Sequence, residues 1–260
     1  MTTRSTLRLE NVSKAFVRAA SVQGAEELTY ALDGVSTEVF TGEFISIVGP
    51  SGCGKSTILR LIAGLIAPTT GRVTLNGKDV GEPSPNRAMV FQKPTLFPWL
   101  SVADNVSFSP RMLGRKKEKK DAVDRLIAMA GLSEFRDAYP HQLSGGMAQR
   151  VSLIRTMIND PEVFLLDEPL GALDAFTRMN MQDELISMWK HRQCMMILVT
   201  HDVDEAIYLS TKVIVMAPRP GRIVEEIPIE LDYPRNRAGR RFLDYRTKVL
   251  KMLDFGRAEE

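Results

Sequence analysis

Residues 49–57 read GPSGCGKST and follow a short apolar run, FISIV, at residues 44–48. From Gly49 to Ser56 the stretch fits the pattern G-x-x-x-x-G-K-[ST] without a mismatch. Its glycines let successive backbone N–H groups turn inward, and those groups and the N-terminus of a following helix form a cradle for an anion. We expect Lys55 to reach the β- and γ-phosphates and the Ser56 hydroxyl to coordinate Mg²⁺. The stretch therefore predicts a nucleoside triphosphate site rather than a merely structural strand-to-helix turn.

The whole stretch, here called the phosphate loop, is expected to contact the nucleotide. Cys53 lies among its glycines, so a thiol-directed reagent should block binding if the loop is accessible, and bound nucleotide should protect the thiol. The residues predicted to bind are Gly49, Pro50, Ser51, Gly52, Cys53, Gly54, Lys55, Ser56 and Thr57.

The composition is ordinary for a globular chain with room for a substantial core. Of the 260 residues, 44% are hydrophobic and 25% are charged, and the net charge of +2 gives no signal for binding to nucleic acid. The N-terminal MTTRSTLRLE lacks the apolar segment of a secretion signal, and no apolar run is long enough to cross a bilayer. Cys53 and Cys194 form neither a disulfide framework nor a metal spacing, which favours a reducing cytoplasm.

Short apolar runs alternate with helical patterns along the chain. The runs at 44–48, 163–166 and 195–199 are too short for lone helices and too uniformly apolar for half-exposed strands. They predict central strands of a parallel sheet that is covered on both faces. Helical periodicity follows at 55–67 and 174–190. The alternation predicts an α/β fold, a phosphate-loop NTPase core whose mostly parallel sheet is flanked by helices.

Other segments predict two additions to this core. Shorter, alternating runs near residues 7–12 and 72–77 predict an antiparallel β subdomain, and the runs at 212–216 and 222–230 predict a hairpin around the turn APRPG. Between Gln92 and Pro161 the pattern is helical, which predicts an inserted helical subdomain. We place the core with its β subdomain at 1–92 and 160–230, the helical subdomain at 93–159, and a C-terminal helical tail packed on the core at 231–260.

An acidic pair, Asp167 and Glu168, stands at the C-terminal end of the second apolar run, in VFLLDEP. In a parallel sheet that end faces the same crevice as the phosphate loop. Adjacent residues on an extended segment point to opposite sides, so we expect the two carboxylates to have different roles. Asp167 is predicted to hold Mg²⁺, directly or through water, and Glu168 to act as the general base that polarises an attacking water.

A second phosphate-binding device is indicated by LSGGM at residues 143–147, here called the signature segment, because Ser144, Gly145 and Gly146 precede a helical pattern. Here the sequence resembles the ATP-binding cassette (ABC) family, whose signature is LSGGQ. The resemblance spans nearly the whole chain. It implies ATP and Mg²⁺ as ligands, and a head-to-tail homodimer in which the phosphate loop of one copy and the signature segment of the other close over the same ATP.

Three further residues match motifs of that family in order. Gln92 resembles the glutamine that contacts Mg²⁺ and the attacking water. Asp174, in LGALD, resembles the end of the loop that crosses the dimer interface. His201 resembles the histidine that contacts the γ-phosphate and orients the catalytic carboxylate. The resemblance therefore implies catalytic roles for Glu168, His201 and Gln92, with Gln92 also a metal contact.

The aromatic residue that stacks on adenine is open between two positions. Phe16, in SKAF, matches the family position, but the unusual stretch 17–29 separates it from the next strand and leaves Tyr30 as a competitor. Met147 departs from the usual glutamine at the end of the signature segment. The same substitution occurs in several importer ATPases, which makes it a mark of a subfamily rather than a defect.

FPWLSVADNV, DEPLGALDAFTR and MAPRPGRI resemble the importer ATPases for nitrate, taurine and aliphatic sulfonates. The resemblance implies integral-membrane permease subunits as partners, indirectly a periplasmic or lipid-anchored solute-binding protein, and a peripheral location at the cytoplasmic face of the inner membrane. Residues 93–100 are expected to receive a helix of the permease, with Phe97, Pro98 and Trp99 as anchors; the alternative is that Trp99 packs within the helical subdomain. An exporter subunit and a non-transport ABC ATPase remain the alternative functions.

Overall fold

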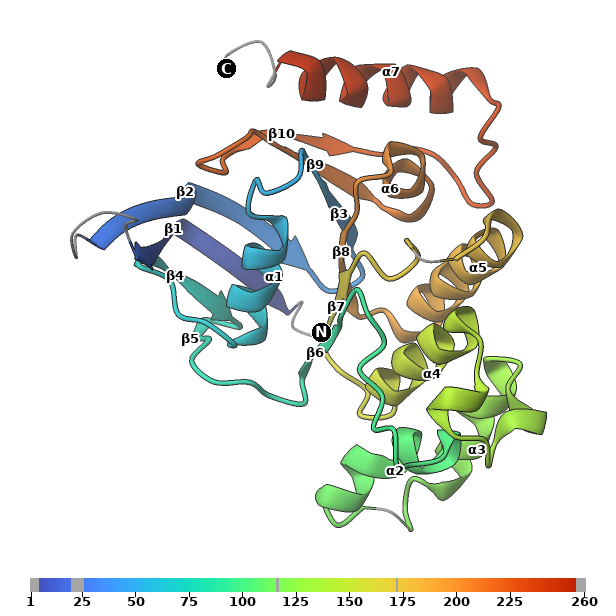
Figure 1. The fold of residues 1–260 in the computed structure, drawn as a ribbon. Coiled ribbons are helices and arrows are strands. Elements are labelled where there is room, and N and C mark those ends of the chain that lie inside the picture. Colours follow the sequence, from blue (N-terminus) through green and yellow to red (C-terminus); the bar gives the residue numbers. More distant parts are fainter. Residues whose placement is uncertain (1–4, 20–25, 116, 172, 256–260) are drawn as a thin grey trace.

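A computed structural model describes residues 5–19, 26–115, 117–171 and 173–255 of the chain, and its strands form two sheets (Figure 1). One sheet has six strands in the order β10-β9-β3-β8-β7-β6, and the other has four in the order β2-β1-β4-β5. The six-stranded sheet is parallel except at its β10 edge, whereas the four-stranded sheet is antiparallel throughout. This confirms the predicted fold class.

The parallel sheet is the centre of the molecule, and every residue of β3, β7 and β8 is buried. Alternate residues of these strands enter two separate hydrophobic clusters, as period-two side chains on a doubly covered sheet must. Thus Phe44 and Val48 pack on one face and Ile45 and Ile47 on the other. The strands are β3 (Phe44–Val48), β6 (Arg87–Val90), β7 (Val163–Asp167), β8 (Met195–Val199), β9 (Lys212–Met216) and β10 (Ile223–Pro228).

Helices cover the two faces of this sheet unequally. The cluster that contains Ile45 also contains residues of α1 and of the antiparallel sheet, whereas the cluster that contains Phe44 draws most of its residues from the other helices. The core helices are α1 (Lys55–Ala63), α5 (Ala175–Arg192), α6 (Val203–Leu209) and α7 (Arg240–Phe255). The C-terminal helix α7 lies across the β9 and β10 end of the sheet and buries Phe242 and Val249 (Figure 1).

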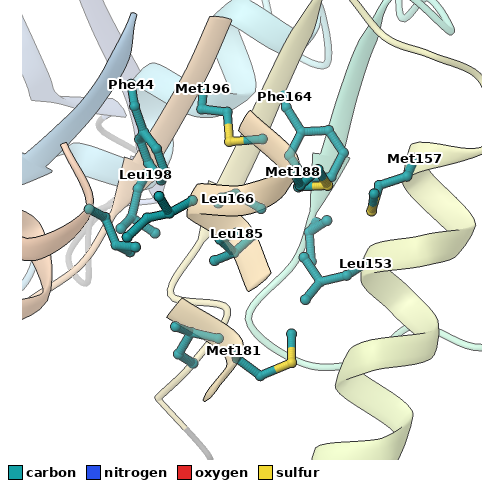
Figure 2. Packing of buried hydrophobic residues seen from close by; sticks show 14 of the residues in the cluster. Phe44, Leu153, Met157, Phe164, Leu166, Met181, Leu185, Met188, Met196 and Leu198 are labelled. Atoms are coloured by element: carbon teal, nitrogen blue, oxygen red, sulfur yellow. The ribbon is translucent and has the colours of Figure 1, made fainter. Parts of the chain in front are cut away.

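A helical segment lies between β6 and β7, as the sequence predicted. It comprises α2 (Val102–Met112), α3 (Lys120–Met129), the short turns η1 (Ser133–Phe135) and η2 (Pro140–Gln142), and α4 (Gly145–Met157). Leu153 and Met157 of α4 pack against methionine and leucine side chains of α5 (Figure 2). Each such fully buried side chain contributes about 1.5–3 kcal/mol, so this contact anchors the insertion to the core. The domain boundaries at 92, 159 and 230 stay predictions.

The antiparallel sheet consists of β1 (Thr6–Ala19), β2 (Glu26–Phe40), β4 (Thr70–Leu75) and β5 (Lys78–Asp79). The β1–β2 pair continues beyond the last β1–β4 pair, Ser13 with Thr70, and forms a two-stranded arm. Within the stretch 17–29, which follows Phe16, residues 17–19 and 26–29 are therefore paired strand residues of this arm. Residues 20–25 of it lie outside the described residues.

Two features departed from the sequence patterns. The strand β6 was not predicted, because its four residues RAMV include an arginine and form no apolar run. In the structure only Val90 of this strand is buried. Phe176 and Met179 belong to the apolar periodicity of α5, yet their side chains are 83% and 49% exposed. The buried stripe of that helix therefore begins later, at Met181.

Candidate nucleotide-binding site

The phosphate loop connects β3 to α1, and its backbone bends around the Lys55 side chain. Lys55 is 7% exposed, and its ammonium donates hydrogen bonds of 2.8 Å to the Gly49 carbonyl and 2.9 Å to the Pro50 carbonyl. Gly54 caps α1 with a φ of 94°, a conformation that favours glycine, and a Cβ there would lie 2.5 Å from Leu32 Cδ2. The loop is thus a preformed turn that exposes the N-terminus of α1.

A cavity of about 370 Å³ opens in front of this loop. It combines residues of the loop with residues of the β1–β2 arm, of the β7 end and of the β9–β10 turn. Its lining consists of Phe16, Thr29, Ala31, Ser51, Gly52, Gly54, Lys55, Ser56, Thr57, Glu168 and Arg219. The structure therefore brings six of the nine predicted loop residues, together with Glu168 and Phe16, to one cavity.

The other three loop residues, Gly49, Pro50 and Cys53, do not line the cavity. Gly49 and Pro50 hold Lys55 through their carbonyls. Cys53 is 0% exposed, and burial raises the pKa of its thiol, so the less reactive protonated form is favoured. The predicted block by thiol-directed reagents required an accessible cysteine in the loop. Because Cys53 is buried, that block is not expected.

The Ser56 hydroxyl and the Asp167 carboxylate meet at the entrance to α1. Ser56 Oγ donates a 2.8 Å hydrogen bond to Asp167 Oδ1. Asp167 is 8% exposed, and its burial raises the pKa of the carboxyl, against the opposing effect of the Ser56 hydrogen bond. Within the described residues no three His, Cys, Asp or Glu side chains form a metal cage. One hydroxyl and one carboxylate fit Mg²⁺, which usually binds one or two protein oxygens together with substrate phosphates.

The two carboxylates of the acidic pair are separated by a backbone turn. The strand β7 ends at Asp167, and Glu168 adopts a φ of 45°, a left-handed conformation that is uncommon for a non-glycine residue. The prediction that both residues extend from one strand was therefore wrong for Glu168, although their side chains do separate. Strain of this kind clusters at functional sites, and here it is held by a hydrogen bond from the Glu168 amide to the Val199 carbonyl at 2.9 Å.

Gln92 and His201 converge on one oxygen of Glu168. Gln92 Nε2 donates to Glu168 Oε2 at 3.1 Å, and His201 Nδ1 lies 3.3 Å from the same oxygen. Gln92 follows β6 and His201 follows β8, on either side of the β7 strand that leads to Glu168. The topology of the sheet thus assembles the three residues predicted to be catalytic, because the carboxyl ends of parallel strands share one edge.

Phe16 and Tyr30 are separated by the register of the arm. Phe16 pairs with Thr29 and Tyr30 pairs with Ala15, so the two aromatic rings project from opposite faces. Phe16, Thr29 and Ala31 line the cavity, whereas Tyr30 does not. The geometry therefore favours Phe16 as the platform for the base.

The signature segment and Asp174 lie next to each other but contribute nothing to the lining of this cavity. Ser144 caps α4 by accepting a 3.3 Å hydrogen bond from the Met147 amide, and Asp174 caps α5 by accepting a 3.0 Å bond from the Thr177 amide. A Cβ on Gly146 would lie 3.2 Å from Leu173, so Gly146 is packed against the residue that precedes Asp174. The roles of Ser144, Gly145, Gly146 and Asp174 at a nucleotide remain predictions.

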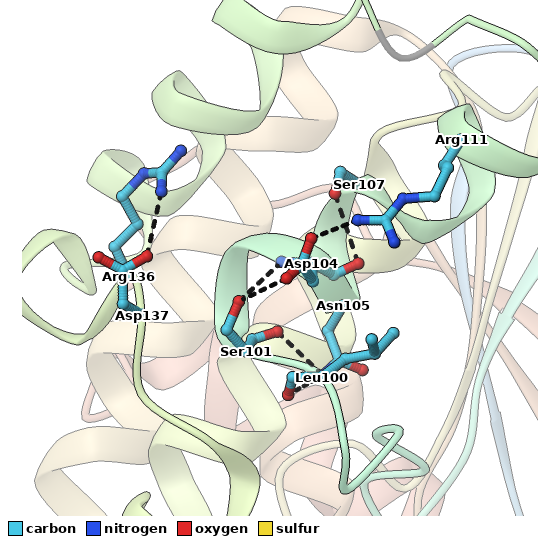
Figure 3. Close-up of polar contacts among 8 residues, drawn as sticks. All are labelled: Leu100, Ser101, Asp104, Asn105, Ser107, Arg111, Arg136 and Asp137. Carbon is cyan, nitrogen blue, oxygen red and sulfur yellow. Dashed lines mark hydrogen bonds and ion pairs between the residues drawn. The ribbon is translucent and has the colours of Figure 1, made fainter.

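The segment after Gln92 is fastened by a buried asparagine at the start of α2 (Figure 3). Asn105 is fully buried, accepts a 2.9 Å bond from the Phe97 amide and donates a 2.9 Å bond to the Leu100 carbonyl. The loop therefore holds its shape while Trp99 stays 69% exposed. Phe97, in contrast, packs against Phe108, with ring centroids 4.4 Å apart.

Sequence reasoning missed three residues of the cavity, namely Thr29, Ala31 and Arg219. Thr29 and Ala31 could have been found only from the register of the arm. Arg219 stands in MAPRPGRI, a stretch that resembles the importer ATPases but whose local pattern indicates no role for the arginine.

Comparison with known proteins decides the family. The sequence profile described as "ABC transporter" matches residues 32–171, which is more than half of the chain. The chain belongs to the ABC transporter family. As an ABC ATPase it binds ATP, and the cavity in front of the phosphate loop is the candidate site.

Relatives of this ABC ATPase agree over nearly the full length. An uncharacterized ABC transporter ATP-binding protein of Methanocaldococcus jannaschii is 48% identical, over 95% of this chain and 91% of the relative. The taurine import ATP-binding protein TauB of Jannaschia sp. is 45% identical, over 95% and 93%. The aliphatic sulfonates import ATP-binding protein SsuB of Bacillus anthracis is 40% identical, over 96% and 97%.

Solved structures agree with the fold of this ABC ATPase. It is similar, with a TM-score of 0.73 and 30% identity, to a dimeric ATP-binding cassette in a post-hydrolysis state bound to ADP and Pi. That match covers 87% of this chain and all of the other. Among the residues described, no helix is both long and apolar enough to cross a bilayer.

Proposed function

We propose that this ABC ATPase energises the uptake of a small anion, with taurine and aliphatic sulfonates as the first candidates and nitrate as a further one. The observation that carries the catalytic part is the convergence of Gln92 and His201 on Glu168 at the edge of a cavity that also contains the phosphate loop. The names of the relatives TauB and SsuB support the substrate class.

In the proposed mechanism the phosphate-loop amides and Lys55 bind the phosphates of ATP, and Phe16 supports the base. Glu168 accepts the proton of the attacking water, while His201 and Gln92 hold its carboxylate in position. Ser56, Asp167 and Gln92 would hold Mg²⁺, which neutralises phosphate charge when bound. Asp167 is hydrogen-bonded to Ser56, whereas Glu168 lies against Gln92 and His201. The proposal therefore assigns Asp167 to the metal and Glu168 to the attacking water.

Two copies are proposed to enclose two nucleotides, since the cavity of one copy is open and contains no residue of its own signature segment. Ser144, Gly145 and Gly146 of the second copy would then complete the site, with Asp174 at the interface. The dimeric state of the matched cassette supports this arrangement. Closure and reopening of the dimer would drive integral-membrane permease subunits, and residues 93–100, with the exposed Trp99, would be their docking loop.

With such partners the chain would act as a peripheral subunit at the cytoplasmic face of the inner membrane. A periplasmic or lipid-anchored solute-binding protein would deliver the anion, and the ATPase itself would not contact it. The test is purification of the native complex and its reconstitution into liposomes with the co-purified binding protein. ATP-dependent uptake of taurine, an alkanesulfonate or nitrate is expected; ATP-dependent efflux without a binding protein would assign the chain to an exporter.

A further inference from the structure

The turn between β9 and β10 is packed against the phosphate loop. A Cβ on Gly221 would lie 2.0 Å from the Cys53 carbonyl oxygen and 3.0 Å from that of Ala31. The Gly221 amide donates a 3.0 Å hydrogen bond to the Ala31 carbonyl. The turn therefore touches both the loop that cradles the phosphates and the strand that lines the other end of the cavity.

Arg219 lies in this turn, and its guanidinium rests on Gly52 of the phosphate loop. Arg219 Nε donates a 2.7 Å hydrogen bond to the Gly52 carbonyl. The φ of Gly52 is 78°, a backbone conformation that favours glycine, and a Cβ there would lie 2.8 Å from Arg219 Nη2, so the arginine side chain would have to shift. Arg219 also lines the cavity.

Among the residues that the structure describes, no acidic side chain pairs with Arg219, and its guanidinium donates a hydrogen bond to a neutral carbonyl. Arg222, three residues further on, differs, because it is paired with Asp33 outside the cavity lining. A guanidinium presents five N–H donors in a planar fork that matches phosphate oxygens, and Arg219 uses only Nε here.

We propose that Arg219 is a second cationic contact for the phosphates of the nucleotide, presented from the β9–β10 turn. Lys55 binds from inside the loop, and Arg219 binds from the outer side of Gly52. This assignment rests on the cavity being the ATP site. Because the turn also bonds to β2, phosphate contact at Arg219 links the phosphate loop to the arm that carries Thr29 and Ala31.

The test compares Arg219→Gln with the control Arg222→Gln, using competition against a fluorescent ATP analogue at low and high salt. ATP affinity is expected to fall about tenfold in Arg219→Gln, which corresponds to about 1.4 kcal/mol. The ATP affinity of Arg219→Gln should also depend less on salt concentration than that of the wild type. Adenosine should bind this variant as it binds the wild type, because adenosine has no phosphate. Arg222→Gln should match the wild type, and Arg219→Lys should be intermediate because an ammonium lacks the planar fork.

Wild-type ATP affinity in both Arg219→Gln and Arg219→Lys would overturn the proposal. Equal losses for ATP and adenosine would also overturn it, because they would indicate a structural role. If Arg219→Gln does not fold, as judged by its melting curve, unchanged ATP affinity in Arg219→Lys overturns the proposal and a selective loss for ATP supports it. Lys55→Ala is measured alongside as a test of the cavity itself. A normal ATP affinity in that variant would show that ATP does not bind in this cavity, and the proposed function would then fail together with the contact at Arg219. A loss in Lys55→Ala without a loss at Arg219 would overturn the role of Arg219 alone.

Discussion

The Ser56 hydroxyl donates a 2.8 Å hydrogen bond to Asp167 Oδ1, and this contact ties the first turn of α1 to the end of β7. Both groups are oxygen ligands of the kind that Mg²⁺ binds. The pKa of Asp167 is raised by burial, so its carboxyl takes up a proton at higher pH than an ordinary aspartate.

We therefore expect Mg²⁺-dependent binding of ATP to weaken on acidification at a higher pH than that at which an exposed aspartate takes up a proton. The reason is that the protonated carboxyl is a poor ligand for Mg²⁺. Asp167→Asn should weaken this binding and flatten its pH profile, while nucleotide affinity in EDTA changes little. Ser56→Ala is the matched variant that removes the hydroxyl alone. Titration of ATP binding with Mg²⁺ at several pH values measures the effect; an unaltered profile in Asp167→Asn would exclude Asp167 from the metal site.

Replacement of Glu168 by glutamine is expected to leave ATP binding intact and to lower the hydrolysis rate by about 10²–10⁴-fold, the usual contribution of a general base. The substituted amide keeps the shape of the side chain but does not accept the proton. A dimer that persists in ATP should accumulate, visible by light scattering after gel filtration. Normal turnover in Glu168→Gln would remove Glu168 as the base.

Phe16→Ala should weaken ATP binding by about 0.5–1.5 kcal/mol, or about twofold to tenfold, if the ring stacks on the base. Tyr30→Ala is the control, because Tyr30 projects from the opposite face of the same arm and is itself 49% exposed. Equilibrium titration of both variants separates the two residues. A larger loss in Tyr30→Ala would reverse the assignment.

This pair illustrates how far the sequence can be taken. The strands β3, β7 and β8 were predictable because they are uniformly apolar, and the phosphate loop because its spacing is tied to one backbone geometry. Whether Phe16 or Tyr30 faces the cavity depends on pairing between β1 and β2, which no local pattern encodes.

The missed features share this non-local origin. The left-handed turn at Glu168 is held by a bond to Val199 on another strand, and Arg219 reaches Gly52 across 167 positions of sequence. The strand β6 is short and largely half-exposed, so it is defined by its pairing with β7 rather than by its own residues.

The buried Cys53 leads to a further expectation. In a Cys194→Ala background, the remaining thiol should react slowly with a maleimide in the native protein and fully after denaturation, because it is 0% exposed and its pKa is raised. Mass spectrometry over time provides the measurement. Rapid labelling of native protein without nucleotide would show that the phosphate loop opens.

The proposed head-to-tail site can be tested by mixing two inactive chains. Ser144→Asp can still cap α4 but places a negative charge where the partner's phosphates would lie, so it should bind ATP yet fail to hydrolyse it. Mixed with Lys55→Ala, it leaves one of the two sites of each mixed dimer intact. If the two sites act independently, a mixed dimer should have about half of the wild-type ATPase rate, and an equal mixture with random pairing about a quarter. Continued inactivity of the mixture, with dimers demonstrated, would contradict the shared site.

Both sheets contribute residues to the cavity. Phe16, Thr29 and Ala31 belong to the antiparallel sheet, and the phosphate loop follows strand β3 of the parallel sheet. A nucleotide seated there fastens the two sheets to each other. At a concentration one hundred times its Kd, it adds about 2.7 kcal/mol to the free energy of unfolding. Release of the nucleotide would remove this stabilisation, so we expect the free energy of unfolding to fall each time the site empties.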